Sequence, residues 1–455
     1  MSDLIRFLAE NAVKVQFKDI PPNIVEFTKI CILDTLGALI AGFDSLGCYT
    51  AVELVREWGG KPESTILRYG VKAPCPAAAF VNSIFARALD FESAARPGLH
   101  LNASTIPTAL AVGEMLGASG RDIITSMAVG EDLALRINRT TNYGITYNGF
   151  DPTGICGVFA TATVAGKLLG LNENEMHNAL GIAFNKAAGS FQSNIDGCLA
   201  IRYIQGFTSS SGIISAILAK KGVTGPINVL EGTYGYYKLF SEGKYDRNSV
   251  LEGLGKEFLG PRYTMFKRWP SCGATLSVID GTLELKEEYG INAKNIDEVI
   301  VTVGPYAYNL AGQHFIGAKD PRIKAQFSLY YAVSNALVRG RLKLEHYTEK
   351  YIFDPEIQSF SQKVKIVEDK TIDTEFRAEV QIRLKNGDVY RKVCGPPKGH
   401  PENPITREDI AIKFRDCATF SSRPLSERLI KDIQEKIFNL DKIENIKDVI
   451  EMLSS

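Results

Sequence analysis

The chain has 455 residues, and its 52 Lys and Arg residues balance 52 Asp and Glu residues, so the formal net charge is zero. Hydrophobic residues make up 45% and charged residues 23%, values typical of globular proteins rather than disordered ones. A neutral chain without a basic stripe is not expected to bind nucleic acid. The length predicts two or three domains.

The eight cysteines form no CxxC pair, and the five histidines show no HxH or HExxH spacing. We therefore expect buried thiols in a reducing compartment and no metal. Residues 1–15 lack the cleavage pattern of a signal peptide, and the apolar stretch 30–43 contains Asp34 and is too short to span a bilayer. These features predict a cytoplasmic protein with no membrane partner.

Residues 1–264 show mostly helical periodicity. Pro21 and Pro22 open a predicted helix in which apolar residues recur every three or four positions as far as Ile40. Further helices are predicted over 78–89, 105–116, 160–169 and 208–220. Their many small residues would let helices pack closely in a bundle. An α-solenoid is the alternative, but the chain shows no fixed repeat period.

The pattern changes after Pro261. Strands are predicted over 296–303, 364–367, 378–384 and 389–394, and a helix over 327–338. Asn386-Gly387 between two alternating runs predicts a hairpin. A Pro/Gly-rich linker follows over 395–404, and 407–418 and 425–453 are again helical.

These elements predict a mainly α fold. We expect a large helical domain over 1–264, a smaller α+β domain over 265–400, and C-terminal helices within 401–455 that return to the helical domain.

The first candidate site segment is the polar stretch 87–100 between two apolar helices, with Asp90, Glu92, Arg96 and His100. A histidine beside carboxylates can be tuned for proton transfer. The alternative is a solvated loop whose Asp and Ser residues cap helices, and the local pattern alone favours that alternative.

The second segment, 149–157, is rich in glycine, which permits close approach of a ligand to the backbone. Asp151 or Thr153 could cap the following helix and leave its N–H groups free for an anion. Tyr143 and Tyr147 precede it as candidate proton donors. A plain loop leading into a helix is the alternative, and no phosphate-binding GxxxxGK[ST] motif is present.

The third segment, 266–272, lies at the predicted domain junction, where ligand sites are favoured. Lys267 and Arg268 could pair with a carboxylate, and a partly buried lysine can act as a base. The alternative is an exposed basic pair at a linker.

Several short motifs follow one another over roughly residues 5–420. They are Leu33-Asp-Thr-Leu-Gly37, Ala88-Leu-Asp-Phe91, His100 with Ile106-Pro107, Phe150-Asp-Pro-Thr-Gly154, Lys167-Leu-Leu-Gly-Leu171, Asp196-Gly197, Thr224-Gly-Pro226, Leu230-Glu-Gly232, Lys267-Arg-Trp-Pro-Ser-Cys272 and Phe327-Ser-Leu. In order and spacing they resemble the family of 2-methylcitrate dehydratase and cis-aconitate decarboxylase, often called the MmgE/PrpD family, which also contains iminodisuccinate epimerase.

The resemblance implies a helical domain built from both chain ends, a smaller α+β lid, a homodimer formed through the helical domains, and no cofactor. It implies a site in the cleft between domains. The chemistry implied begins with loss of a proton next to a carboxylate, after which water or carbon dioxide leaves, or the proton returns to the other face.

Three family positions are matched by Asp90, His100 and Lys267. Four others differ, because Asp151, Ile204 and Leu276 stand where histidine is usual and Ile201 stands where lysine is usual, although Arg202 remains. The changes remove cationic or proton-carrying groups. A buried carboxylate without a partner is costly, so a dicarboxylate or an amine-bearing substrate fits better than a tricarboxylate.

We therefore expect an enzyme that moves a proton α to a carboxylate of a small organic acid. The candidate catalytic residues are Lys267, His100, Asp90 and Tyr147, and the candidate substrate-binding residues are Arg202, Arg268, Asp151, Ser271 and Tyr143. Dehydration would use His100 and Lys267 as acid and base in either order, whereas epimerisation would use Lys267 with Tyr147 or Tyr143. The alternatives are decarboxylation, a non-catalytic ligand-binding homologue and a helical scaffold for protein partners.

Overall fold

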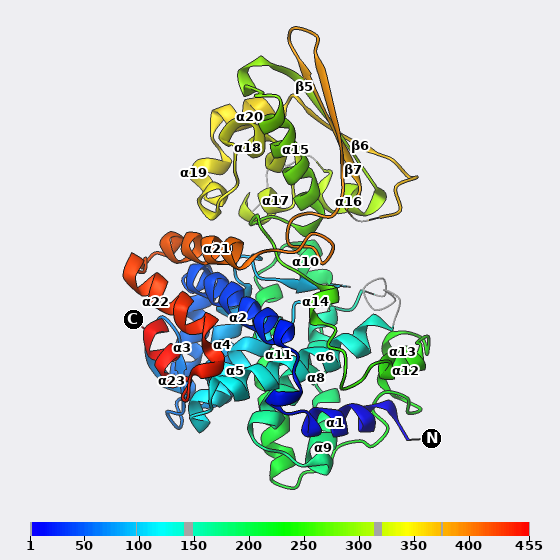
Figure 1. Cartoon of the computed structure of the whole chain (residues 1–455), viewed down its shortest axis with the longest axis vertical. Coiled ribbons are helices and arrows are strands. Elements are labelled where there is room, and N and C mark those ends of the chain that lie inside the picture. Colours follow the sequence, from blue (N-terminus) through cyan, green and yellow to red (C-terminus); the bar gives the residue numbers. More distant parts are fainter. Residues whose placement is uncertain (1, 97, 141–148, 314–320, 375, 455) are drawn as a thin grey trace. The chain divides into compact units, whose positions relative to one another are not determined.

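The structure is a computed structural model that describes residues 2–96, 98–140, 149–313, 321–374 and 376–454. It divides into two compact units, which are described separately: unit 1 comprises residues 1–265 and 410–455, and unit 2 comprises residues 266–409 (Figure 1). Residues 401–409, which we expected to belong with the C-terminal helices, group with unit 2. Backbone bonds account for part of this, because Phe266 N donates to Gly399 O and Gly399 N donates to Asn403 O.

Unit 1 is helical, with two short two-stranded sheets. Its helices are α1 (Leu4–Lys14), α2 (Pro22–Gly42), α3 (Cys48–Trp58), α4 (Cys75–Arg87), α5 (Asn102–Leu116), α6 (Gly120–Arg139), α8 (Pro152–Leu168), α9 (Glu173–Phe184), α10 (Gln192–Asp196), α11 (Ala200–Lys220), α12 (Tyr236–Phe240), α13 (Arg247–Leu251), α14 (Gly260–Tyr263), α21 (Arg407–Phe420, from residue 410 on), α22 (Glu427–Phe438) and α23 (Lys447–Leu453). Its strands are β1 (Ser64–Ile66), β2 (Val71–Ala73), β3 (Ala94–Ala95) and β4 (Thr264–Met265).

The five helices predicted in the N-terminal part are confirmed as α2, α4, α5, α8 and α11. Four of them begin three to eight residues earlier than expected. The first two turns of α8 hold Pro152, Gly154 and Gly157, and the start of α11 is partly polar, so apolar periodicity is weak there. Proline at the first helical position suits its restricted φ.

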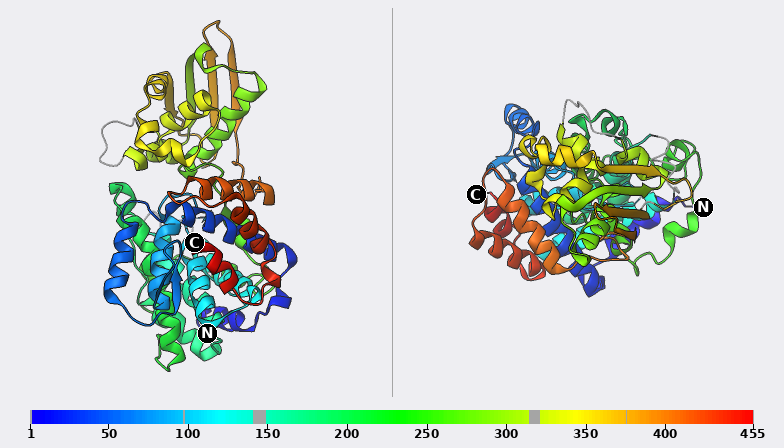
Figure 2. Two further views of the ribbon diagram at one scale, coloured as in Figure 1. Left: turned by 90° about the vertical axis from the view of Figure 1, so that its left-hand side faces the viewer. Right: turned by 90° about the horizontal axis from the view of Figure 1, so that it is seen from above.

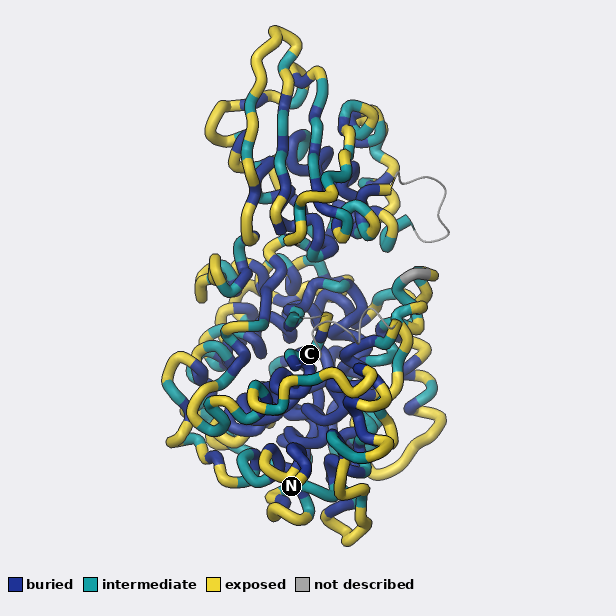
Figure 3. Tube along the Cα trace, turned by 90° about the vertical axis from the view of Figure 1, so that its right-hand side faces the viewer, coloured by how far each residue is buried: buried dark blue, intermediate teal, exposed yellow. Residues whose placement is uncertain are grey.

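Close packing of α4, α8 and α11 depends on small residues. A Cβ atom at Gly206 of α11 would lie 2.7 Å from the ring of Phe80 on α4, and one at Gly212 would lie 2.1 Å from Thr161 Oγ1 on α8. Most residues of α4 and α8 are buried, and buried segments gather in the middle of unit 1 (Figure 3). The prediction that small residues permit close helix packing is therefore confirmed at these positions.

The C-terminal helices contact the N-terminal part of unit 1 (Figure 2). Ile446 N donates to Ala118 O at 2.9 Å, and Arg68 N donates to Leu453 O at 3.1 Å. The helical stretch predicted over 425–453 consists of two helices, because a 3-10 turn over Leu440–Lys442 separates α22 from α23. Asn residues mark the break: Asn439 bonds back to Glu435 O, and the Asn445 side chain accepts from Lys447 N.

Unit 2 combines a four-stranded sheet with helices. Its strands are β5 (Ile296–Val303), β6 (Val364–Glu368), β7 (Ala378–Leu384) and β8 (Val389–Cys394). Its helices are α15 (Leu276–Glu288), α16 (Pro305–Ala311), α17 (Pro321–Gln326), α18 (Leu329–Arg339), α19 (Glu349–Ile352) and α20 (Pro355–Ser361). All four strands and the helix predicted over 327–338 are confirmed.

The sheet order is β6-β5-β7-β8, with β5 and β6 parallel and the other pairs antiparallel. Val299, Val301 and Val303 of β5 are buried at every second position, as a strand with one face in the core requires. They share a core with apolar residues of α15 and α18. None of the helices described is long and apolar enough to cross a membrane.

Candidate active site

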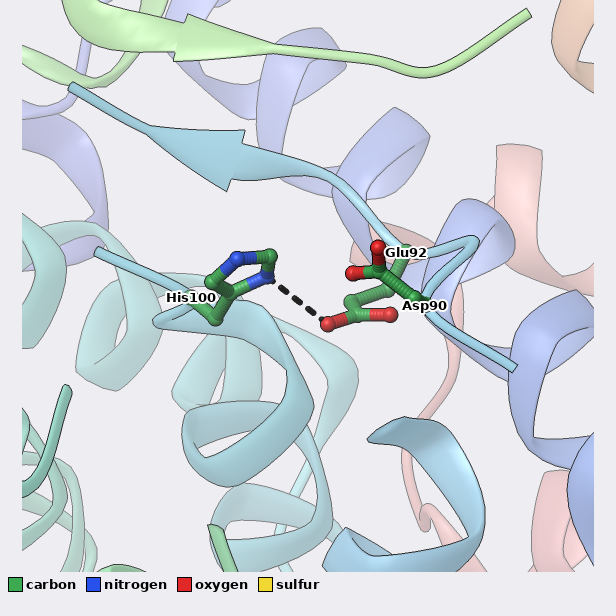
Figure 4. A group of neighbouring side chains, drawn as sticks. All are labelled: Asp90, Glu92 and His100. Carbon is green, nitrogen blue, oxygen red and sulfur yellow. Dashed lines mark hydrogen bonds and ion pairs between the residues drawn. The ribbon is translucent and has the colours of Figure 1, made fainter. Parts of the chain in front are cut away.

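A short loop between α4 and α5 carries the first group of candidate residues (Figure 4). The loop includes β3, which pairs antiparallel with β4 so that Ala94 lies opposite Met265. Asp90 has a φ of 51°, a left-handed conformation that non-glycine residues adopt rarely and that Asp tolerates better than most. This backbone turn allows Asp90 and Glu92 to lie near His100.

Glu92 and His100 form a carboxylate–histidine pair. Glu92 Oε1 lies 2.9 Å from His100 Nδ1 (Figure 4). Glu92 is fully buried, whereas the His100 side chain is 18% exposed. A carboxylate at Nδ1 orients the ring and leaves Nε2 as the nitrogen that can exchange a proton with a ligand.

Arg87, at the end of α4, neutralises this group of carboxylates. It forms ion pairs with Asp90 and, at 3.4 Å, with Glu92. Burial lowers the pKa of Arg87, but the carboxylates of Asp90 and Glu92 outweigh it and the net shift is upward. Burial raises the pKa of Glu92, but Arg87 and His100 outweigh it and hold that pKa below its usual value. Glu92 is therefore an anion at neutral pH.

The second segment approaches the same group from the start of α8. Asp151 caps α8, because its Oδ1 accepts from Thr153 N at 2.8 Å. Thr153 Oγ1 accepts from His100 N at 3.0 Å, which ties the helix start to the loop. Asp151 is buried, and its charge contributes to the raised pKa of Arg87. Of the two capping residues that the sequence left open, Asp151 is the one observed.

Of the other predicted residues in the N-terminal part, the structure describes Arg202. Arg202 of α11 is buried, and its Nη1 donates to Leu46 O at 2.7 Å. One role of Arg202 is therefore to bind a backbone carbonyl group within unit 1. Tyr143 and Tyr147 lie outside the described residues.

The third segment belongs to unit 2. Lys267 is 3% exposed, so the alternative of an exposed basic pair is wrong for this residue. Arg268 is half exposed and lies over the Trp269 ring at 4.8 Å. Ser271 is buried in the unit, where its Oγ contacts Thr275 Oγ1 at 2.7 Å and donates to Gln326 O at 3.0 Å.

Arg87 and Glu92 were missing from the predicted set. A usable signal for Arg87 was its spacing of three from Asp90, which brings side chains together at a helix end. Glu92 was named in the polar stretch 87–100 as a carboxylate near His100 but was not chosen as a catalytic or binding residue, because the turn that brings it to His100 is a tertiary feature.

Asp90, Glu92 and His100 also form a possible metal-ligand set, since their ligand atoms lie within 4.8 Å of one another. Sequence spacing had shown no such set. Carboxylate and imidazole groups suit several divalent ions. The buried guanidinium of Arg87, however, already pairs with both carboxylates and would repel a dication. The arrangement fits a proton-transfer pair better than a metal centre.

Two family domains match the chain. Residues 6–248 match the MmgE/PrpD N-terminal domain, and residues 269–438 match the MmgE/PrpD C-terminal domain.

Curated relatives match over nearly the whole chain. A cis-aconitate decarboxylase of Aspergillus terreus is 27% identical, covering 96% of this chain and 93% of its own length. The cis-aconitate decarboxylase of Homo sapiens is 24% identical, covering 93% and 89%. The mitochondrial 2-methylcitrate dehydratase of Yarrowia lipolytica is 25% identical, covering 92% and 84%. The named relatives are enzymes of the lyase type.

Proposed function

Because the chain belongs to the MmgE/PrpD family, a family of lyase-type enzymes, we propose that it is a cofactor-independent lyase that takes a proton from the carbon next to a carboxylate of a small organic acid. The observation that carries the proposal is the contact between His100 Nδ1 and the buried Glu92 carboxylate. A histidine oriented in this way is suited to give or take a proton at Nε2.

The reaction proposed is dehydration. A base removes the proton next to the carboxylate, the released electron pair forms the carbon–carbon double bond, and the hydroxyl leaves as water with a proton from an acid. His100 and Lys267 are the two proton carriers, as acid and base in either order. Asp90 would place a negative charge near the carbon from which the proton is removed.

Chain connectivity supports a role for Lys267. Only Phe266 separates it from β4, and β4 pairs with β3 in the loop that carries Asp90, Glu92 and His100. Two residues span at most about 7 Å, so the Lys267 backbone stays near Met265 whatever arrangement the units adopt. The long lysine side chain adds to this reach.

The charges around His100 support a substrate with few carboxylates. Asp90, Glu92 and Asp151 supply three carboxyl groups, and the guanidinium of Arg87 pairs with the first two. A ligand with three carboxylates would meet repulsion here, and each unpaired charge would be costly. We therefore propose a dicarboxylic acid, bearing a hydroxyl group as the substrate of dehydration or an amino group as the substrate of the alternative epimerisation, bound with help from Arg202, Arg268 and Ser271.

Two alternatives remain on the same scaffold. An epimerase would need a second proton carrier on the opposite face, for which Tyr143 or Tyr147 is the candidate, and a decarboxylase would release carbon dioxide instead of water. A non-catalytic homologue would bind an organic acid without turnover.

The test is solvent deuterium exchange in heavy water, with 2-hydroxy and 2-amino dicarboxylic acids compared with cis-aconitate and 2-methylcitrate. We expect a dicarboxylate to lose water or incorporate deuterium, and Lys267→Ala and His100→Gln each to slow this at least roughly a hundredfold, the scale of a general acid or base. Lys294→Ala, at an exposed position of unit 2, and His177→Gln, at a half-buried position of unit 1, serve as controls.

Products separate the alternatives: an alkene indicates dehydration, carbon dioxide indicates decarboxylation, and an inverted, deuterated substrate indicates epimerisation. If no acid in the panel reacts but one shifts the thermal unfolding midpoint, the binding-protein alternative holds. If Lys267→Ala matches the wild type, Lys267 is not a proton carrier.

We further propose that the protein is a cytoplasmic homodimer. Free thiols at all eight cysteines, only Cys198 of them exposed, support a reducing compartment. An apolar surface of unit 1 supports self-association. We call it the α11 patch and define it by the exposed side chains of Trp58, Phe207 and Ile214. The rings of Trp58 and Phe207 both lie tilted against the ring of Phe80, with centroids 6.4 and 5.4 Å away.

A further inference from the structure

We infer that Asp34 and Lys413 are positioning residues that hold the backbone on both sides of Glu92 and so keep its carboxylate against His100. The inference rests on the proposed function of that pair. Asp34 belongs to the Leu33–Gly37 motif of α2, and Lys413 belongs to α21 of the C-terminal part. Neither residue touches the group that carries the chemistry.

The two residues form a buried ion pair. Lys413 Nζ lies 2.6 Å from Asp34 Oδ1, and both side chains are at most 5% exposed. Lys413 Nζ also donates to the carbonyl oxygen of Phe91 at 2.6 Å and lies 4.0 Å from the centre of the Phe91 ring. A single ammonium group therefore fixes the residue before Glu92.

Asp34 fixes the residue after Glu92. Its Oδ2 accepts from Ser93 N at 2.9 Å. The hydroxyl of Ser93 in turn accepts from Asn102 Nδ2 at 2.8 Å, at the start of α5. Glu92 is thus held between two anchored backbone groups, and its own carboxylate is left to Arg87 and His100.

Stability alone is a weak reason for such a pair, because replacing buried ion pairs by apolar residues is often neutral or stabilising. Here each ion also binds the backbone of the loop, Lys413 at the Phe91 carbonyl and Asp34 at Ser93 N. Burial raises the pKa of Asp34, and the Lys413 ammonium opposes that rise. Removing Lys413 would therefore favour a neutral Asp34, a weaker acceptor for Ser93 N, and would leave the Phe91 carbonyl without its donor.

The experiment compares Lys413→Met and Lys413→Arg with Lys29→Met. Lys29 is a matched control, because it is a buried lysine on α2 that pairs with Asp441 of the C-terminal part at 2.6 Å. It forms no ion pair or hydrogen bond with the described residues of the loop between α4 and α5. Two readouts are used. One is kcat and KM with the substrate found by the exchange test. The other is the ring 13Cε1–1H signal of His100 in histidine-labelled protein, assigned with His100→Gln.

We expect Lys413→Met to lower kcat on the order of tenfold to a hundredfold, as misplacement of a catalytic group does, and to change KM less than about threefold. It should also move the His100 signal. Lys413→Arg, which keeps the positive charge, should retain wild-type kcat and the wild-type His100 signal. Lys29→Met should lower the unfolding midpoint while leaving kcat and the His100 signal at wild-type values.

A Lys413→Met protein with wild-type kcat and an unmoved His100 signal would overturn the inference, as would equal effects from Lys29→Met. If Lys413→Met does not fold, Asp34→Asn/Lys413→Met removes both charges and keeps an acceptor for Ser93 N, and the same shift of the His100 signal is expected. The His100 signal is measured without substrate, so it tests the positioning role even if the proposed reaction does not take place.

Discussion

Glu92 and Glu131 are both fully buried in unit 1, yet their surroundings give them opposite ionisation behaviour. The ionic neighbours Arg87 and His100 hold the pKa of Glu92 below its usual value despite burial. For Glu131 of α6, burial raises the pKa to about 8, and a hydrogen bond to Thr105 opposes that rise. Neighbouring charge, rather than burial, decides which carboxyl group is an anion at neutral pH.

The raised pKa of Glu131 predicts a pH-dependent stability. Between about 4.5, the value in an unfolded chain, and about 8, the folded protein holds a proton that the unfolded chain releases, so the free energy of unfolding falls as pH rises through this window. Glu131→Gln cannot ionise. We expect it to raise the free energy of unfolding at pH 8.5 by on the order of a few kcal/mol and to change it little at pH 4.5, as measured by urea denaturation.

Glu114→Gln is the control for this experiment. Glu114 is also buried, but it pairs with Lys72 and accepts from Thr65 N at 2.7 Å. Its replacement should destabilise the protein at pH 8.5 because it removes an ionic partner. Parallel pH profiles for Glu131→Gln and the wild type would show that Glu131 is already ionised in the folded state.

At the scale of elements, the sheet of unit 2 is defined by local patterns. The strands β5, β7 and β8 begin and end at the predicted residues, because alternating burial and turn residues coincide there. In the β7–β8 hairpin, Gly387 has a φ of 97°, and Leu384 N donates to Asp388 O at 2.8 Å. The turn needs a residue that tolerates positive φ.

Gly387→Ala should therefore destabilise unit 2 by about 1–2 kcal/mol, the cost of a left-handed backbone for an L-residue. Space is not the cause, because a Cβ atom at Gly387 would meet nothing within 4 Å. Gly395→Ala is the matched control, since that site is equally open and its φ is not positive. Differential scanning calorimetry should show a lower midpoint for Gly387→Ala alone, and equal midpoints would contradict the turn argument.

At the scale of the whole molecule, the α11 patch predicts the oligomeric state. Trp58 and Phe207 are 63% and 61% exposed, and large apolar side chains gathered on one surface are typical of interfaces. Light scattering at micromolar concentration should give twice the chain mass of 50.0 kDa. Phe207→Glu should shift the protein toward the monomer, because a buried charge without a partner is costly at an interface.

Leu239→Glu is the control for the dimer, since Leu239 of α12 is 51% exposed and does not belong to the α11 patch. It should leave the mass unchanged. A monomeric wild type at micromolar concentration would refute the dimer, and a Phe207→Glu dimer would place the interface elsewhere.

Much of the site was accessible from sequence, but not its pairing. Asp90, His100 and Asp151 were predicted, and the structure brings them together with Thr153 at the start of α8. Glu92, the partner of His100, was named in the candidate segment but given no role, because its role depends on the left-handed turn at Asp90. Arg202 was predicted to bind substrate, and one of its observed contacts is to the Leu46 carbonyl.

The sequence by itself determined the mainly α composition, the boundaries of most strands, the hairpin at Gly387 and the family resemblance, since each depends on residues close together in the chain or on the order of short motifs. Tertiary structure decided which charges meet. The contact of Lys413 with Asp34 joins residues 379 positions apart, and Arg87, Glu92 and His100 converge through a backbone turn and packing. Such contacts arise when distant segments bury one another, and no local periodicity records them.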